Sequence, residues 1–273
     1  MGKLLARSVA ILASATMFAL YARVELPWAL LGWVGLVPWL ATLDRERSTT
    51  SAIANGAAMS AAFTLGVFAW FASAVSRYTE LSPPLAFALL ALAAPVLQPQ
   101  FLVFAAARHV LHARGRGRTA TAVGAACAWV ATEWACPRLF ADTIGHGLLP
   151  FATLRQGADL AGAAGLSFVI LLVNQALHAA LQQSRISPRR ALGAAATALL
   201  LVAALASYGS LRLQQVERRA ETATGGRSIA LTAALVQANL ADYQGLRRRL
   251  GELGAVREIL DTHETMSRRV LVG

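Results

Sequence analysis

Charged residues are scarce in this chain. They make up 14% of the 273 residues, whereas hydrophobic residues make up 56%, and the mean hydropathy is +0.53. A soluble domain carries charge at about a quarter of its positions, so the composition argues against an ordinary soluble enzyme. The shortage is uneven, because long stretches carry almost no charge and the C-terminal tail carries a good share of it. This pattern predicts a polytopic membrane protein with a polar tail.

Cysteine is almost absent, and no metal or other cofactor is expected. Cys127 and Cys136 lie in one apolar run at a spacing that places them on opposite helix faces, which argues against a disulfide or a shared metal site. His109 and His112 have the i, i+3 spacing of metal ligands but no third ligand nearby, so an interfacial position is favoured. The sequence also lacks a glycine-rich phosphate loop and a nucleophile-elbow motif.

Seven apolar segments are candidates for membrane-spanning helices, each of which needs about 20 mostly apolar residues. The second is short and is expected to pair tightly with the first. The basic start followed by an apolar stretch resembles a signal peptide, but further spans follow at once, which favours an uncleaved first span. The candidate spans are residues 4–22, 26–43, 52–76, 84–107, 119–136, 159–182 and 191–211.

Basic residues are distributed asymmetrically over the short loops between these spans. With the N-terminus inside, the opposite side receives only Arg23, Arg77, Arg138 and Arg155. This bias predicts a cytoplasmic N-terminus and, with an odd number of spans, a tail outside the cytoplasm. The net charge of +11 is thus interpreted as a topology signal, and nucleic acid is not an expected partner. The cytoplasmic side receives Lys3, Arg7, Arg45, Arg47, Arg108, Arg114, Arg116, Arg118, Arg185, Arg189 and Arg190.

The chain is expected to divide into three parts. Residues 1–211 form the multi-spanning membrane domain, and residues 212–227 are a polar linker that ends in two glycines. Residues 228–273 begin with a β-type run through Val236, and leucines at helical spacing predict an amphipathic helix over 246–270. One strand and one helix bury too little apolar surface to be stable alone, so this part is interpreted as the incomplete start of an α/β domain.

Glu133 is the clearest candidate for a functional residue in the membrane part. It lies in the apolar stretch CAWVATEWACP, near the outer end of the fifth predicted span. A carboxylate inside the membrane is costly and indicates a functional site. The alternative is that Glu133 lies shallow enough to reach interfacial water, or caps a neighbouring helix.

The loop 137–159 is long for a membrane connection and is rich in glycine and proline. Its apolar side chains predict a position on or in the outer leaflet, where its polar side chains can meet lipid headgroups; a structural cap over the helix bundle is the alternative. The apolar residues are Phe140, Leu148, Leu149, Phe151 and Leu154, and the polar ones are Arg138, Asp142, His146, Arg155 and Gln156.

Four segments in this order resemble apolipoprotein N-acyltransferase: LGVFAW (65–70), WVATEW (129–134), the long run 149–174 from LPFATLRQG to LLVN, and ALVQAN (234–239). The resemblance covers nearly the whole chain, but only as the N-terminal part of the family. It implies a membrane domain followed by the first strand and helix of a nitrilase-like (carbon–nitrogen hydrolase) domain, with residues 1–273 stopping short of the rest. It also implies a multi-pass protein of the bacterial cell (inner) membrane.

The resemblance implies an acyl transfer in lipoprotein maturation. The family moves an acyl chain from a membrane phospholipid to the α-amine of a diacylglyceryl-cysteine, through a thioester on a catalytic Cys, with a Glu as base and a Lys at the oxyanion. These three residues are expected beyond Gly273, since Cys127, Cys136, Glu133 and Glu264 do not match them, and residues 1–273 alone are expected to be inactive. The predicted substrate-binding residues are Glu133, Trp134, Pro150, Phe151 and Gln156.

Two further points qualify this interpretation. Pro150-Phe151 stands where the family often has Pro-Trp, so a lipid-gating role does not carry over directly to Phe151. A different class also fits an intramembrane Glu and an apolar loop, namely a non-enzymatic membrane protein that binds or transports lipid or small solutes.

Overall fold

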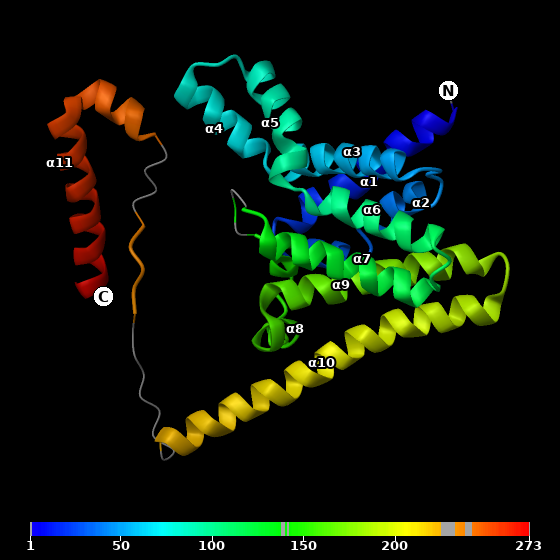
Figure 1. Cartoon of the computed structure of the whole chain (residues 1–273). Coiled ribbons are helices and arrows are strands. Elements are labelled where there is room, and N and C mark those ends of the chain that lie inside the picture. Colours follow the sequence, from blue (N-terminus) through cyan, green and yellow to red (C-terminus); the bar gives the residue numbers. More distant parts are fainter. Residues whose placement is uncertain (1, 138–139, 141, 225–232, 238–241, 273) are drawn as a thin grey trace. The chain divides into compact units, whose positions relative to one another are not determined.

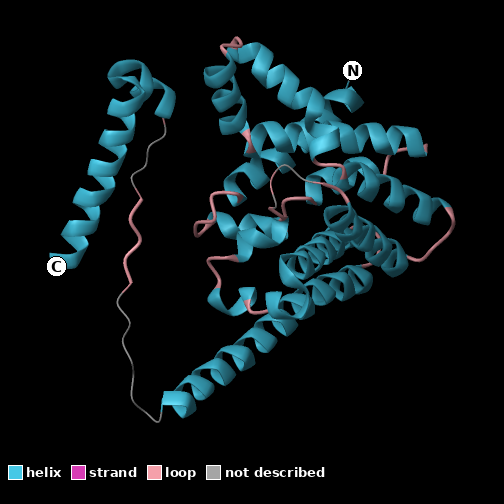
Figure 2. Ribbon diagram, turned by 60° about the vertical axis from the view of Figure 1, so that its left-hand side comes forward, coloured by secondary structure: helices cyan, strands magenta, loops and turns pink. Residues whose placement is uncertain are grey.

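The computed structural model describes all residues except 1, 138–139, 141, 225–232, 238–241 and 273, and it is almost entirely helical (Figure 1). Figure 2 shows the same helices and their connecting loops from a second side. The chain divides into two compact units, Met1–Glu217 and Arg218–Gly273. The elements in order are α1 (Gly2–Tyr21), the 3-10 helix η1 (Trp28–Trp33), α2 (Val37–Leu43), α3 (Thr49–Val67), α4 (Ala69–Thr79), α5 (Pro83–Leu97), α6 (Gln100–Ala113), α7 (Arg118–Ala135), the 3-10 helix η2 (Ile144–Leu148), α8 (Ala152–Arg155), α9 (Ala158–Ser184), α10 (Pro188–Thr224) and α11 (Tyr243–Val272).

Among the described residues, three helices are long and apolar enough to cross a membrane: Leu4–Tyr21 in α1, all of α9, and Pro188–Thr222 in α10. The number rises to five if the bent pairs α3–α4 and α5–α6 each form one span. The first unit is therefore a helical membrane domain, as predicted, and five of the seven predicted spans coincide with these helices. The predicted span 119–136 coincides with α7, whose Arg118, Glu133 and threonines lower its hydropathy below that of the others.

Both bent pairs turn sharply at short breaks. The axes of α5 and α6 differ by 49° across Gln98 and Pro99. Proline has no N–H to donate and disfavours helical geometry in the residue before it, so a straight helix cannot run through this site. The hydroxyl of Ser60 on α3 joins the break from a neighbouring helix, because it donates at 2.8 Å to the Ala94 carbonyl, which also accepts from Gln98 N–H. The α3–α4 pair bends by 71° at Phe68.

The predicted span 26–43 is helical and apolar, but it is broken between η1 and α2. In a continuous helix the Leu36 N–H would donate to the Gly32 carbonyl, four residues earlier. Here the side-chain amide of Asn174 on α9 stands between them: its Oδ1 accepts from Leu36 N at 2.8 Å, and its Nδ2 donates to Gly32 O at 2.8 Å. A broken helix is tolerated in the membrane when a neighbouring helix satisfies the freed backbone groups. Asn174 does this for η1 and α2.

Aromatic side chains fill the centre of the first unit. The ring of Phe101 on α6 lies 4.9 Å from Phe63 on α3 and 4.7 Å from Trp129 on α7, measured between ring centroids. Trp39 on α2 lies 5.6 Å from the same ring. Backbones approach closely beside this cluster, because a Cβ on Gly56 of α3 would lie 2.7 Å from the Phe101 carbonyl oxygen. A small residue at that position is what lets α3 and α6 pack.

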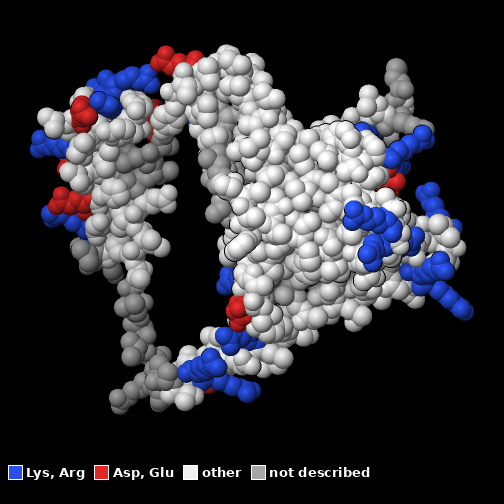
Figure 3. Space-filling model, in the orientation of Figure 1, with Lys and Arg blue, Asp and Glu red and all other residues white. Residues whose placement is uncertain are grey.

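Charge is segregated on the surface of this unit. In Figure 3, a broad uncharged area covers most of the visible face, and Lys and Arg gather towards the end where the N-terminus lies. An uncharged band bounded by charged ends is the surface that a bilayer requires.

The second unit shows only part of the predicted tail. The amphipathic helix predicted over 246–270 is confirmed as α11, with a break in helical geometry at Gly251, where φ is +75°. The predicted strand is not seen: residues 233–237 are in neither helix nor strand, and residues 228–232 lie outside the described residues. The predicted linker begins inside α10, which continues through Thr224, and its two glycines also lie outside the described residues.

Candidate functional site

Glu133 faces the interior of the helix bundle. It lies near the end of α7 and is only 4% exposed. Its Oε1 accepts a hydrogen bond of 2.9 Å from the indole Nε1 of Trp129, one turn earlier on the same helix. Trp129 is itself fully buried, edge-on to Phe101 and Phe104. The carboxyl group is thus held inside protein rather than against lipid, which is the arrangement expected for a polar group that a membrane helix retains.

Trp134, the next residue along α7, points the opposite way. It is 89% exposed, so Glu133 and Trp134 do not share one environment although they are adjacent in sequence. An exposed tryptophan near the end of a membrane helix is typical of the membrane–water interface.

The other three predicted residues lie together around α8. Pro150, Phe151 and Gln156 are all half-buried, and Phe151 packs against the hydrophobic core of the unit. The Gln156 side chain donates to the Ala152 carbonyl at 3.0 Å, within its own turn. Leu149 precedes them and is exposed. This short segment therefore presents an apolar side chain outward from a firmly held backbone.

The loop between α7 and α8 is anchored to the bundle by its backbone. The Tyr21 hydroxyl of α1 donates to the Ile144 carbonyl at 2.6 Å, and Gly145 N donates to the Ser167 hydroxyl of α9 at 3.0 Å. A Cβ on Gly145 would lie 2.1 Å from the Ala163 carbonyl oxygen, and one on Gly147 would overlap the Tyr21 ring. The described part of this loop therefore packs closely on the helix bundle, as a structural cap would. Leu149 also faces outward, so a position of the loop in the outer leaflet is equally compatible with the structure.

Phe140 connects this loop to the bend between α3 and α4. Its ring stacks on Phe68 at a centroid distance of 5.0 Å and an interplanar angle of 12°. Trp70 and Phe71 lie within 5.4 Å of the same ring. The segment 65–70, one of the four that carry the resemblance, is therefore in direct contact with the loop that follows α7. From the sequence Phe140 is only an apolar loop residue, because its stacking on Phe68, more than 70 positions earlier, leaves no local sequence pattern.

The end of α8 is held against α10. A Cβ on Gly209 of α10 would lie 1.9 Å from the Thr153 carbonyl oxygen. Beside this contact, Asp159 at the start of α9 accepts from the Tyr208 hydroxyl at 2.5 Å and pairs with Arg212 at 2.6 Å. The segment that contains Pro150, Phe151 and Gln156 is thus fixed from two helices at once.

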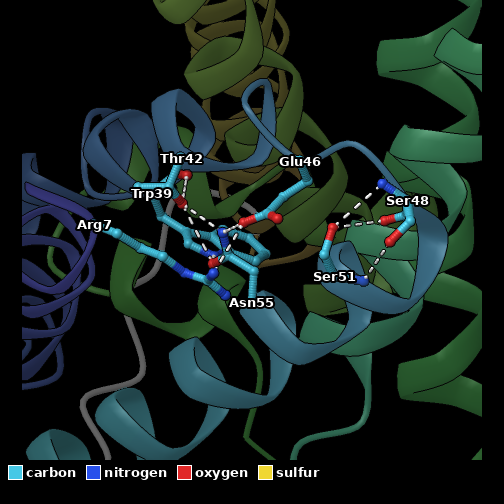
Figure 4. A network of polar contacts seen from close by, with 7 residues as sticks. All are labelled: Arg7, Trp39, Thr42, Glu46, Ser48, Ser51 and Asn55. Atoms are coloured by element: carbon cyan, nitrogen blue, oxygen red, sulfur yellow. Dashed lines mark hydrogen bonds and ion pairs between the residues drawn. The ribbon is translucent and has the colours of Figure 1, made fainter. Parts of the chain in front are cut away.

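A buried polar network lies at the other end of the unit, near the N-terminus. Asn55 of α3 accepts from the Trp39 indole at 3.1 Å and donates to Glu46 at 2.7 Å, and Glu46 pairs with Arg7 of α1 at 3.3 Å. In Figure 4 these side chains converge from α1, α2 and α3 on one point, with Thr42 beside them. The sequence does not predict this network as a whole, although a lone Asn in the apolar run of α3 indicates a buried polar contact.

Asp44 is the centre of a second set of contacts at this end. Its carboxylate accepts from Arg108 of α6 at 2.7 Å and from His178 of α9 at 2.6 Å, and Gln182 is also a partner. Burial raises the pKa of Asp44, but the hydrogen bond from His178 and the charge of Arg108 outweigh this effect and hold the pKa below the ordinary carboxyl value. Gln175 extends the contacts from Arg108 to the Ala122 carbonyl of α7.

The described residues contain no group of three or more His, Cys, Asp or Glu arranged to hold a metal ion. His109 and His112 lie on the last turns of α6, and Cys127 and Cys136 are free thiols.

No curated protein and no solved structure matches the chain. Residues 13–176, more than half of the chain, match the family described as the apolipoprotein N-acyltransferase N-terminal domain. This match runs from α1 to α9, and it includes the α3–α4 bend, Glu133 and the segment around α8. The chain therefore belongs to the family of the apolipoprotein N-acyltransferase N-terminal domain.

Proposed function

We propose that this chain is the membrane part of an apolipoprotein N-acyltransferase. The reaction is the phospholipid-dependent N-acylation of the N-terminal diacylglyceryl-cysteine of lipoproteins, with a membrane phospholipid as donor and the diacylglyceryl lipoprotein as acceptor. The family match over residues 13–176 carries the proposal, and the anchored end of the bundle around Glu133 and α8 supports it.

Glu133, Trp134, Pro150, Phe151 and Gln156 are assigned to substrate binding. Trp134 is exposed on α7 and supplies an aromatic surface to the bilayer. Phe151 is half-buried on a backbone fixed by α8, α9 and α10, so it can support a lipid chain without loss of position. Glu133 keeps a carboxyl group inside the bundle, next to Trp129. None of these groups supplies a nucleophile, so their role is to hold substrate and not to cleave it.

The proposed protein has three parts. Residues 1–211 are the membrane domain with about seven spans, residues 212–227 connect it to the tail, and residues 228–273 are the first part of a nitrilase-like domain. Two observations support the division: the compact units separate at Glu217 and Arg218, and α11 matches the helix predicted after the first strand.

The N-terminus is placed in the cytoplasm of a bacterial inner-membrane protein and the tail outside. The ion pairs of Arg7 and Arg108 support this, because they tie the N-terminal helix, the α2–α3 loop and the end of α6 to one end of the unit. Basic loops gathered at one end indicate the cytoplasmic side. Cysteine labelling from outside intact cells, in a variant without its native cysteines, should then succeed at position 226 and fail at position 116. The reverse pattern would invert the topology.

The experiment that tests the reaction is a chimera. Residues 1–273 are followed by the remaining part of a characterised apolipoprotein N-acyltransferase, and the protein is expressed in a strain depleted of its own enzyme. Mass spectrometry of lipoprotein N-termini should show a third acyl chain with the chimera. Residues 1–273 expressed by themselves should leave the N-termini diacylated, because the members of a catalytic unit act together and losing them removes most of the rate enhancement.

A further inference from the structure

An apolar groove lies where α9 turns into α10. Four parts of the chain form its walls: α1, residues 34–38, the last turns of α9 and the first turns of α10. Its volume is about 750 Å³, within the range of about 300–1,000 Å³ that is usual for binding pockets. Its apolar lining includes Met17, Val34, Pro38, Leu177, Leu181 and Leu192.

The groove exists because α10 stands apart from the other helices. Only 6% of its apolar span is buried inside the structure, whereas its first turns face α9 across the groove. From Pro188 to Ala195 the groove follows α10 for about 10 Å, given a rise of about 1.5 Å per residue. A groove of this length, open to the side in a membrane domain, holds hydrocarbon and not water.

Positive charge surrounds the end of the groove at the α9–α10 turn. Ser184 and Pro188, which line that end, are separated by a turn that contains Arg185, and Arg189 and Arg190 follow. All three arginines are exposed, and no ion pair among the described residues involves them. The sequence contains no acidic residue between Asp159 and Glu217. The lining is otherwise apolar, so the groove combines a hydrocarbon surface with a mouth whose three arginines form no ion pair among the described residues. Asp44, which Gln182 of the same end of α9 contacts, is already paired with Arg108.

We infer that this groove binds an anionic phospholipid. One acyl chain lies between α9 and α10 against Leu177, Leu181 and Leu192, and the headgroup phosphate lies at the arginines of the turn. Basic pockets between membrane helices bind anionic headgroups in this way. This lipid is bound and not consumed, so the inference goes beyond the proposed acyl transfer and does not depend on it.

The positive charge of the α9–α10 turn argues against a second copy of the chain as the occupant of the groove. A two-fold contact through the groove would bring the same turn of each copy to one interface, and the arginines at positions 185, 189 and 190 would repel their counterparts. A phosphate provides the opposite charge, and guanidinium groups bind phosphate in a forked geometry. A zwitterionic lipid fills the groove equally well but gains less from the mouth.

The test is lipid binding to the full purified chain, in neutral detergent and at low salt, followed by native mass spectrometry. Dioleoyl phosphatidylglycerol and dioleoyl phosphatidylethanolamine are titrated separately. The anionic lipid should bind about fivefold more tightly for each arginine within reach of the headgroup, and raising the salt concentration should reduce this preference. Equal binding of the two lipids by the unaltered chain would overturn the inference.

Two pairs of variants separate the mouth from the groove. The triple variant R185Q/R189Q/R190Q should lose the preference for the anionic lipid, whereas R114Q/R116Q/R118Q, which removes three arginines from the α6–α7 loop and its helix start, should keep it. Ala195→Phe should fill the groove and weaken both lipids, whereas Ala196→Phe, on an exposed and non-lining position of the same helix, should not.

Three results would contradict the inference even if the unaltered chain prefers the anionic lipid. The first is an equal loss of preference in the two arginine triple variants. The second is unchanged lipid binding in Ala195→Phe while circular dichroism shows the parent helix content. The third is a dimer of the unaltered chain that Ala195→Phe dissociates, which would make a second copy the occupant.

Discussion

Replacing Asn174 by leucine should destabilise the membrane domain more than any other polar-to-apolar change on α9. The side chain is fully buried and bonds to both backbone groups that the break between η1 and α2 leaves open, Leu36 N–H and Gly32 C=O. Leucine has a similar size but cannot donate or accept. A buried backbone group left without a partner costs about 1–3 kcal/mol, so the two groups together give a loss of about 2–6 kcal/mol. The bond from Asn174 to the Ile170 carbonyl adds little, because that oxygen lies in a continuous helix.

The loss is measured as the free energy of unfolding in mixed micelles, with increasing sodium dodecyl sulfate as denaturant. Thr197→Leu on α10 is the matched control, because its hydroxyl bonds only to the Gly193 carbonyl of its own exposed helix. Surface changes of that kind stay within about 0.5 kcal/mol. If Asn174→Leu unfolds at the same denaturant fraction as the parent and as Thr197→Leu, the bridging role of Asn174 is wrong.

Three further predictions follow from the site and its surroundings. Gly209→Ala places a Cβ 1.9 Å from the Thr153 carbonyl oxygen and should lower the free energy of unfolding by about 1–3 kcal/mol. The control Gly193→Ala, with no atom within 4 Å of the added Cβ, should be neutral or stabilising. Equal effects of the two variants would show that α8 does not pack on α10. Glu133→Gln keeps the acceptor for Trp129 and should leave insertion intact while it lowers lipid binding or acyl transfer in the completed chimera; unchanged values of both would return Glu133 to a purely structural role. The pKa of Asp44 is lowered, so its contribution to the free energy of unfolding is complete above the ordinary carboxyl pKa of about 3.9 and is lost as the pH falls towards the lowered value. The free energy of unfolding, measured from pH 6 into the acid range, should therefore fall less steeply in Asp44→Asn than in the parent. Parallel pH dependences of the two proteins would refute the ion-pair network.

The sequence predicted the helical membrane domain because hydropathy depends on composition over about 20 residues. It did not predict where helices break. Residues 26–43 read as one apolar segment, and the break depends on Asn174, which is far away in the chain. The bend at Pro99 was open to prediction, because proline interrupts a helix by its own chemistry.

The candidate site was predictable only in part. The inward position of Glu133 followed from the cost of a carboxylate in lipid, and the structure places it inside. Its separation from Trp134 also follows from helix geometry, because adjacent residues lie on different faces. The polar network around Asp44 and Asn55 assembles from loops and helices that are distant in sequence, so its partners could not be predicted, although Asn55 in an apolar run indicates a buried polar contact.

The strand predicted at 228–236 rested on local β-type composition. Strand formation needs a partner strand, and the described part of that run, residues 233–236, pairs with none. The helix predicted after it needs only its own backbone hydrogen bonds, which explains why α11 is present.

The most direct test of the central claim is the acylation state of lipoprotein N-termini in cells that carry the chimera as their sole N-acyltransferase. The account predicts triacylated N-termini with the chimera, and diacylated N-termini with residues 1–273 alone at equal membrane abundance. A chimera that inserts stably yet leaves the lipoproteins diacylated would contradict the proposed function. A third acyl chain produced by residues 1–273 alone would show that the chemistry lies in residues assigned here to substrate binding.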